Sequence, residues 1–302
     1  MASLKDIKRH IVAVKQTQKL TRAMNMVAAA KLRSTQNRTE RFRYYAEEHA
    51  RLIQEIADRS PPDACSLLLP SESSRKVLIL GITSDRGLCG SFNTNLCSHL
   101  DRQIVAQRKD GYEPELFLIG RKGRDYYNRR KVKIYSDLVG VTGSFDYVLA
   151  QKIAEALIEE YMAGNYREIY VMYTLFKSLS RFEVTFERFL PLGQEEETAP
   201  KAKSPAPGHD GSGKVDQDYV IEPKADVLLT RLIPRSLSIM IYRAMLESVT
   251  SENAARMQAM DNASKSCKDI IESLTMAYNK ARQAAVTSEL LDIVNGAEAL
   301  KD

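Results

Sequence analysis

The chain has 302 residues, of which 44% are hydrophobic and 27% charged, and its net charge is +5. This composition can bury one large core or two ordinary ones, which excludes an intrinsically disordered protein. The N-terminal segment lacks the apolar core of a secretory signal, and no stretch reaches the ~18 to 20 apolar residues of a membrane span. The mildly basic charge suits an acidic partner, nucleic acid or a membrane surface and does not choose between them.

The first 60 residues contain neither glycine nor proline, and Pro61 and Pro62 then end the run. This pattern predicts one helix over residues 1–60, which at 55 helical residues would reach on the order of 80 Å. Its apolar residues recur at steps of three and four and form a narrow stripe, typical of a helix that pairs with another helix. The stripe consists of Ile7, Ile11, Val14, Met24, Val27 and Ala28.

The residue pattern after this helix is different, and we assign residues 75–192 to an α/β domain. Short apolar runs predict strands over residues 76–83, 115–120, 168–176 and 182–190, the last with alternating polarity. Residues 145–162 read as a helix, and a turn-rich segment after the first strand leads into another. Strands separated by helices predict a small Rossmann-like domain with a mostly parallel sheet.

Residues 193–217 are rich in proline, glycine, serine and charge, which predicts a flexible loop. The C-terminal segment, residues 218–302, then repeats the design of the N-terminus. Residues 235–295 contain no glycine or proline, and Pro234 and Gly296 flank them, so we expect a second long helix there. Two series seven residues apart predict its heptad seam: Ile270, Ala277, Ala284 and Leu291, and Leu274, Ala281 and Ser288.

Two enzyme readings have to be weighed for residues 84–93, the sequence SDRGLCGSFN. Glycines between a strand and a helix can expose N–H groups to a phosphate, but neither GxGxxG nor GxxxxGK[ST] is present. A Cys89 nucleophile with His99 has no protease signature around it. The four cysteines also lack CxxC spacing, so we expect a reducing compartment and no metal. A tight structural turn remains the simpler interpretation.

Basic residues crowd the first helix, where eleven Lys and Arg stand against two acidic residues over residues 1–43. Nucleic-acid binding is one interpretation, but few aromatics are interleaved and no base-reading signature is present. The charge pattern fits better a long basic helix that sits inside, or against, an acidic partner protein. Because narrow seams cannot rigidify single helices, we expect the two terminal helices to wind into a long antiparallel coiled coil.

Three segments carry a specific family resemblance. Residues 7–32, residues 83–93 and residues 251–263, the last continued by residues 278–283 and 289–297, resemble the signatures of ATP synthase γ subunits in the family's order. The likeness spans almost the whole chain except residues 193–217. The resemblance implies a non-catalytic central-stalk rotor of a proton-translocating ATP synthase, which couples c-ring rotation to conformational change in the catalytic β subunits.

The resemblance also implies partners and sites. The coiled coil would enter a hexamer of α and β subunits, while the α/β domain would meet the ε subunit and the membrane c-ring, with no cofactor and no nucleic acid. The implied location is the cytoplasmic side of a bacterial inner membrane, where the chain would be peripheral. Asn25 and Asn253 depart from residues frequent in the family, which leaves local contacts open. The family's hexamer contacts map onto Met24, Arg256, Arg282, Gln283, Thr287 and Glu289.

Overall fold

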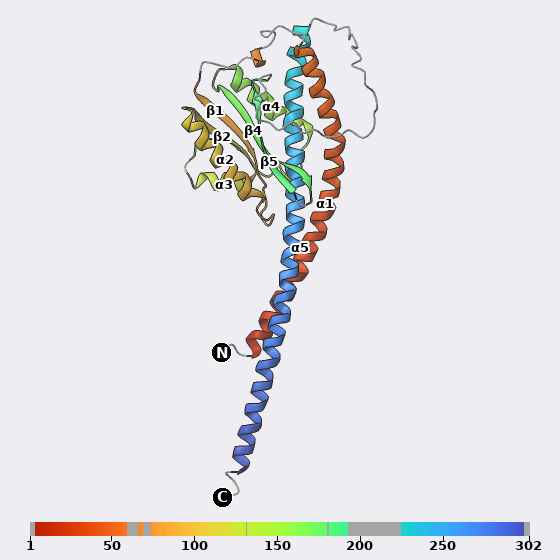
Figure 1. Ribbon diagram of the computed structural model, residues 1–302, viewed down its shortest axis with the longest axis vertical. Coiled ribbons are helices and arrows are strands. Elements are labelled where there is room, and N and C mark those ends of the chain that lie inside the picture. The colour runs from red at the N-terminus through yellow and green to blue at the C-terminus, as the bar shows by residue number, and fades with distance from the viewer. Residues whose placement is uncertain are drawn as a thin grey trace. The chain divides into compact units, whose positions relative to one another are not determined.

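The computed structural model describes residues 4–58, 66–68, 74–130, 132–179, 181–192 and 225–298 (Figure 1). The loop predicted at residues 193–217 lies outside the described residues. The chain divides into two compact units. The helix-pair unit consists of Met1–Thr35, Arg86–Phe92 and Thr250–Asp302, and the sheet unit of Gln36–Asp85 and Asn93–Val249.

Two long helices dominate the secondary structure, as the sequence predicts. Helix α1 spans Leu4–Asp58 and helix α5 spans Ala225–Glu298, with 55 and 74 residues. Each helix contributes its residues to both units.

Helix α5 begins earlier than predicted, because Pro234 lies inside it rather than in front of it. A proline inside a helix costs about 3 kcal/mol through its missing N–H and its steric clash. Side chains at four-residue steps around it are fully buried, and each contributes roughly 1.5 to 3 kcal/mol. Core packing therefore outweighs the proline; the buried residues are Leu229, Ile233, Leu237 and Ile241.

The sheet unit contains one five-stranded sheet of order β3-β2-β1-β4-β5, which confirms the predicted mostly parallel α/β arrangement. Strands β1 to β4 pair in parallel and β5 pairs antiparallel with β4. Strand β3 was not predicted; it has five residues, alternates in burial and lies at the sheet edge. The strands are β1 Lys76–Ile82, β2 Glu113–Ile119, β3 Ile134–Leu138, β4 Glu168–Ser178 and β5 Arg181–Leu190.

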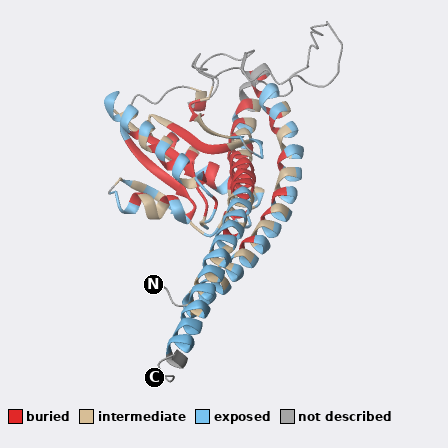
Figure 2. Cartoon of the chain, turned by 60° about the horizontal axis from the view of Figure 1, so that its bottom comes forward, coloured by how far each residue is buried: buried red, intermediate tan, exposed pale blue. Residues whose placement is uncertain are grey.

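Helices cover both faces of this sheet (Figures 1 and 2). Helices α2 (Phe92–Lys109) and α3 (Arg121–Asn128) pack on one face, where Val77 and Ile79 point. Helix α4 (Tyr147–Met162) and the first part of α5 pack on the other, where Leu78 and Leu80 point. A short 3-10 turn, Ser66–Leu68, borders the second core. Asp146 caps α4 by accepting the Leu149 N–H at 2.9 Å, so this helix begins two residues later than predicted.

Strand β1 lies between β2 and β4, and the chain leaves its carboxyl end into the turn at residues 84–93. In open parallel sheets, ligands bind at such a reversal of strand order. The fold thus places the most unusual motif of the sequence at the position where an enzyme of this architecture would hold its ligand.

Candidate partner-binding surface and the central turn

In the helix-pair unit, α1 and α5 are joined by hydrogen bonds from side chains to main-chain carbonyls. The Asn25 Nδ2 donates to the Met257 carbonyl at 2.9 Å, and the Gln18 Nε2 donates to the Ser264 carbonyl at 3.4 Å. Residue numbers rise on α1 while they fall on α5, so this part of the two helices runs antiparallel. Both steps are seven residues, the repeat of a heptad seam.

The less exposed residues of α1 follow alternating steps of three and four from Leu4 to Leu32. Of the predicted stripe, Ile7, Ile11, Val14 and Ala28 lie on this seam, and Met24 flanks it, whereas Val27 is exposed. The seam residues in chain order are Leu4, Ile7, Ile11, Val14, Gln18, Thr21, Asn25, Ala28 and Leu32.

On α5 one of the two predicted heptad series is wrong. Ile270 is 45% exposed, and the residues at seven-residue steps after it are exposed as well. The less exposed series runs one position later, through Ile271, Tyr278 and Ala285, and alternates with Leu274 and Ala281 of the second predicted series. Since both choices give steps of three and four with Leu274, spacing alone could not separate them.

The last part of α5 extends beyond the described part of α1. Continuing the observed register places Ile11 opposite Ile271 and Leu4 opposite Tyr278, so the following twenty helical residues, 279–298, reach about 30 Å further. This overhang, defined as residues 279–298, exposes several large apolar side chains, and Figure 2 colours the described C-terminal end of α5 as exposed. They are Val286, Leu290, Leu291, Ile293 and Val294, and side chains of this kind on a solvent-exposed helix mark an interaction surface.

Four of the six predicted contact residues lie in the overhang, and all four are exposed: Arg282, Gln283, Thr287 and Glu289. The Thr287 hydroxyl donates to the Gln283 carbonyl at 2.9 Å, one helical turn earlier. The structure therefore brings these four together on a single helix and leaves their charged and amide groups available.

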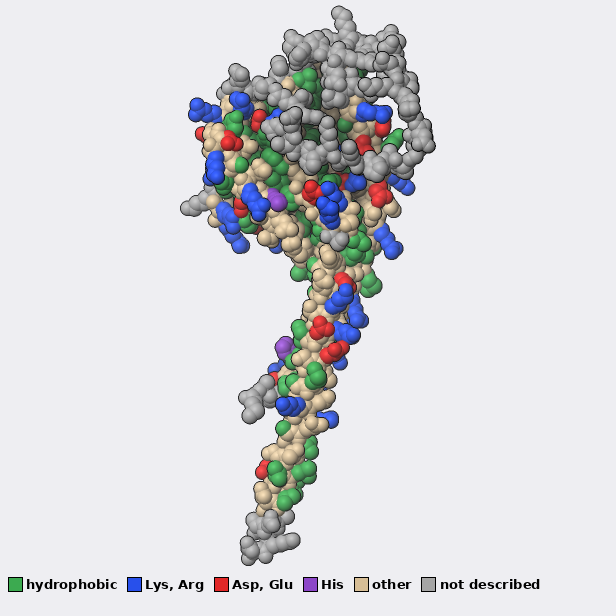
Figure 3. Space-filling view, in the orientation of Figure 1, with side chains coloured by type: hydrophobic (Ala, Val, Ile, Leu, Met, Phe, Trp, Pro, Cys, Tyr) green, Lys and Arg blue, Asp and Glu red, His purple; other side chains and the backbone are tan. Residues whose placement is uncertain are grey.

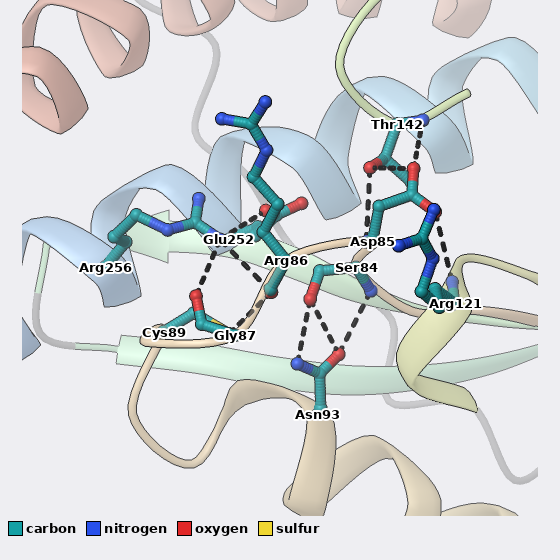
Figure 4. A network of polar contacts seen from close by, with 10 residues as sticks. All are labelled: Ser84, Asp85, Arg86, Gly87, Cys89, Asn93, Arg121, Thr142, Glu252 and Arg256. Carbon is teal, nitrogen blue, oxygen red and sulfur yellow. Dashed lines mark hydrogen bonds and ion pairs between the residues drawn. The ribbon is translucent and has the colours of Figure 1, made fainter. Parts of the chain in front are cut away.

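The other two predicted contacts differ from this group. Met24 is partly exposed and flanks the seam of α1. The Arg256 side chain is only 13% exposed; it pairs with Glu252 at 2.7 Å and donates to the carbonyls of Arg86 and Gly87, each at 3.3 Å. Arg256 thus holds the tip of the central turn against α5 within the helix-pair unit (Figure 4).

The basic charge predicted on α1 is divided between two roles. In the helix-pair unit its cations are exposed along the helix (Figure 3): Lys5, Lys8, Arg9, Lys15, Lys19, Arg22, Lys31 and Arg33. In the sheet unit, Arg43 pairs with the buried Glu247, and Arg38 donates to the Tyr242 hydroxyl and lies over that ring. The first group and the exposed Arg41 remain a surface for an acidic partner.

The base of the central turn is organised by Asp85 in the sheet unit (Figure 4). Its carboxylate accepts the N–H groups of Gly140 at 2.7 Å, of Thr142 at 3.0 Å and of Arg121 at 3.0 Å, and the Thr142 hydroxyl at 2.8 Å. Burial alone would raise the pKa of Asp85, but the hydrogen bonds from Gly140, Thr142 and Arg121 lower the pKa below its ordinary value. Asp85 was not predicted, although an Asp three residues after the end of a buried strand is a signal that could have found it.

These contacts argue against both enzyme readings of the turn. A phosphate at this edge of the sheet would lie beside the Asp85 carboxylate, whose negative charge would repel it, and the neighbouring N–H groups of Arg121, Gly140 and Thr142 already donate to that carboxylate. The Cys89 side chain is 2% exposed and its Sγ lies 3.8 Å from the Arg86 carbonyl, which leaves a substrate no path to the sulfur. Among the described residues, no helix is long and apolar enough to cross a membrane, and no group of metal-ligating side chains is present.

A second buried polar group in the sheet unit also escaped prediction. The Glu247 carboxylate on α5 is fully buried and accepts Arg43 Nη2 at 2.6 Å and Arg43 Nε at 3.1 Å. It also accepts the Phe176 N–H at 3.2 Å at the end of β4. Neither residue belongs to a local motif, because the pair forms only when α1, α5 and β4 come together.

Comparison with known proteins agrees with this architecture. The family model described as ATP synthase matches residues 3–300. Over 303 aligned residues the chain is 42% identical to the ATP synthase gamma chain of Syntrophobacter fumaroxidans, with 100% of both chains covered. It is likewise 42% identical to that of Syntrophus aciditrophicus, with 99% of both covered.

Solved structures give the same fold at lower identity. A chain of the Euglena gracilis mitochondrial ATP synthase, in an assembly of OSCP, F1 and c-ring, superimposes with a TM-score of 0.67 at 18% identity, covering 98% of this chain and 94% of that one. A chain of the Tetrahymena thermophila central stalk and c-ring gives a TM-score of 0.59 at 24% identity, covering 81% and 99%. From its full-length match to the family model and to these relatives, the chain belongs to the ATP synthase gamma chain family.

Proposed function

We propose that this chain is the central-stalk rotor subunit of a rotary ATP synthase and that it has no catalytic site of its own. The observation that carries the proposal is the exposed, single-helix overhang of α5 in a chain that aligns from end to end with γ chains. In this role, rotation of the membrane c-ring turns the chain, and the chain changes the conformation of the catalytic β subunits.

The torque-bearing element in this proposal is an antiparallel coiled coil of α1 and α5. Its support is the hydrogen-bonded register at Asn25 and Gln18 and the three-four spacing of the less exposed residues on both helices. A lone helix of this length would bend readily, and winding two helices together stiffens both.

The proposed partner of the helix pair is a hexamer of α and β subunits. Arg282 and Gln283 present donors suited to carboxylate and carbonyl groups of a β loop, and Thr287 and Glu289 would extend that contact. The exposed cations of α1 and the partly exposed Met24 fit an acidic segment of β. Each exposed ion pair contributes only about 0 to 1 kcal/mol, so torque transfer would be spread over many contacts.

We assign the sheet unit and the base of the coiled coil to the contacts with the ε subunit and the c-ring. The chain would then be peripheral on the cytoplasmic side of a bacterial inner membrane, in a complex that translocates protons. Arg256 remains a proposed hexamer contact only through the small part of its side chain that is not turned toward the central turn.

Co-expression tests the proposal. The chain is produced with the α and β subunits of its source, purified through a tag on β, and assayed for ATP hydrolysis. The matched variants are a truncation of residues 282–302 and a full-length chain with Leu290, Leu291, Ile293 and Val294 all replaced by serine. Stoichiometric co-purification of the intact chain, with weaker assembly or activity for both variants, is expected; an intact chain that enters no α/β assembly would refute the rotor role.

A further inference from the structure

The seam of α1 changes character in the middle of the helix-pair unit. Gln18, Thr21 and Asn25 occupy three successive seam positions and form a polar layer, while the seam is apolar from Leu4 to Val14 and again from Ala28. A polar layer weakens an apolar seam, so its presence calls for a physical reason.

The polar layer makes specific contacts. Asn25 and Gln18 donate to the carbonyls of Met257 and Ser264 on α5, whereas the Thr21 hydroxyl donates at 3.0 Å to the Gln18 carbonyl of its own helix. A groove of about 410 Å³ borders the layer, so large apolar side chains do not fill this part of the pair. Hydrogen bonds rather than packing define the geometry here.

Apolar contacts alone cannot fix how far one helix lies along the other. A heptad seam looks nearly the same after a shift of seven residues, and small apolar side chains accept the shifted partner at little cost. The polar layer reduces this degeneracy by one hydrogen bond in either direction, since its two donors and its two acceptors are each seven residues apart. A slip of α1 by one heptad toward the C-terminus of α5 would move Gln18 from Ser264 to Ile271, and the opposite slip would move Ile11 from Ile271 to Ser264.

We propose that Asn25 and Gln18 are positioning residues that fix the axial register of α1 against α5 within the helix-pair unit, in addition to the Arg43–Glu247 pair that joins the same two helices in the sheet unit. In the observed register both carboxamides reach a carbonyl of α5, whereas after a one-heptad slip only one of them would still face the carbonyl of Met257 or Ser264. The consequence rests on the proposed rotor function. A fixed register prevents the two helices from sliding along each other under load, so that the applied torque rotates the helix pair as one body.

A native thiol allows the register to be read in the full-length chain. Cys267 is buried on the seam of α5, and the observed register places it between Val14 and Gln18. In a background with the other three cysteines replaced by alanine, Val14→Cys reports the native register, and Ile7→Cys and Thr21→Cys report the two one-heptad slips. Disulfides form only when the Cα atoms lie within about 7 Å, so the rates of oxidation compare the registers.

The expected result is specific to the two carboxamides. The parent forms the disulfide at position 14 and little at positions 7 or 21. Gln18→Leu with Asn25→Leu reduces this preference by about fivefold, since a one-heptad slip in either direction costs one of the two hydrogen bonds. Asn25→Gln, which keeps the amide, and the exposed control Gln16→Leu retain the parental pattern.

Helix content and thermal midpoint are measured alongside and should be unchanged or higher in the double variant, because leucines extend the apolar seam. If the double variant unfolds instead, each single leucine variant is tested: Gln18→Leu should lose about fivefold of the preference over position 21, and Asn25→Leu about fivefold of the preference over position 7. A double variant that still forms the disulfide only at position 14 would overturn the proposal. This assay needs no α or β subunit, so its failure would leave the rotor proposal untouched.

Discussion

Removal of the Arg43 guanidinium should destabilise the sheet unit strongly, because it leaves the Glu247 carboxylate without its cation. That carboxylate is fully buried, and it retains only the Phe176 N–H, at 3.2 Å, among the donors described above. Deleting one member of a buried pair costs about 3 to 5 kcal/mol. The Arg43 side chain is 36% exposed, and solvent screening lowers our expectation for Arg43→Met to ~2 to 4 kcal/mol.

A second substitution makes the reasoning testable. Glu247→Gln removes the charge and keeps an acceptor for the Phe176 N–H, so alone it should cost about 1 to 2 kcal/mol. In the Arg43→Met background the same substitution should restore stability, because it abolishes the unpaired charge. Urea unfolding followed by far-UV circular dichroism measures both, with the exposed Arg41→Met as the matched control. A double variant no more stable than Arg43→Met would refute the argument.

Three further predictions concern the sheet unit and are checked by urea or thermal unfolding. Asp85→Asn should lower the free energy of unfolding by ~1 to 2 kcal/mol at pH 7. Because hydrogen bonding lowers the pKa of Asp85, this loss of stability should be complete above pH ~4 and should vanish as the pH falls below that value. A stability difference between variant and wild type that stays constant with pH would contradict this. Gly120→Ala should be the most destabilising of the glycine-to-alanine substitutions, since the added Cβ would lie 2.3 Å from the Thr83 carbonyl oxygen and the backbone φ is +100°. A loss of less than about 1 kcal/mol in the free energy of unfolding would show that the backbone adjusts. His49→Phe should stabilise slightly, because the buried Nδ1 has no hydrogen-bond partner among the described residues. Burial first, and the Arg235 charge second, lower the pKa of His49, so wild-type stability should decline more steeply than the variant's as the pH falls below about 6.5; the pKa of His99, lowered mainly by burial, contributes equally to both.

Long-range features of the fold were predictable where the sequence is uninterrupted. The absence of glycine and proline predicted both terminal helices, and apolar runs predicted four of the five strands. The family resemblance was confirmed by the relatives. The predicted start of α5 was wrong. Pro234 is a local signal for a helix boundary, whereas the burial of Leu229 and Ile233, which overrides that signal, depends on the assembled core.

The site was predictable only in part, for a related reason. Spacing indicated a seam on α5 but could not choose Ile271 over Ile270, because the choice is made by the opposite helix. The exposed positions of Arg282 and Glu289 agree with a contact role, which stays a prediction. The intramolecular contacts of Arg256 depend on a turn about 170 residues earlier, and no local pattern reports such a pairing.

The pairing of α1 with α5 also sets the order of events during synthesis. Asn25 and its acceptor Met257 are separated by 232 positions. At ribosomal rates of about 5 to 20 residues per second, the N-terminal helix emerges roughly 10 to 50 s before its partner exists. During that interval its apolar seam has no partner helix, so apolar surface stays open to aggregation until the last segment leaves the ribosome. Completion of the helix-pair unit is therefore necessarily post-translational.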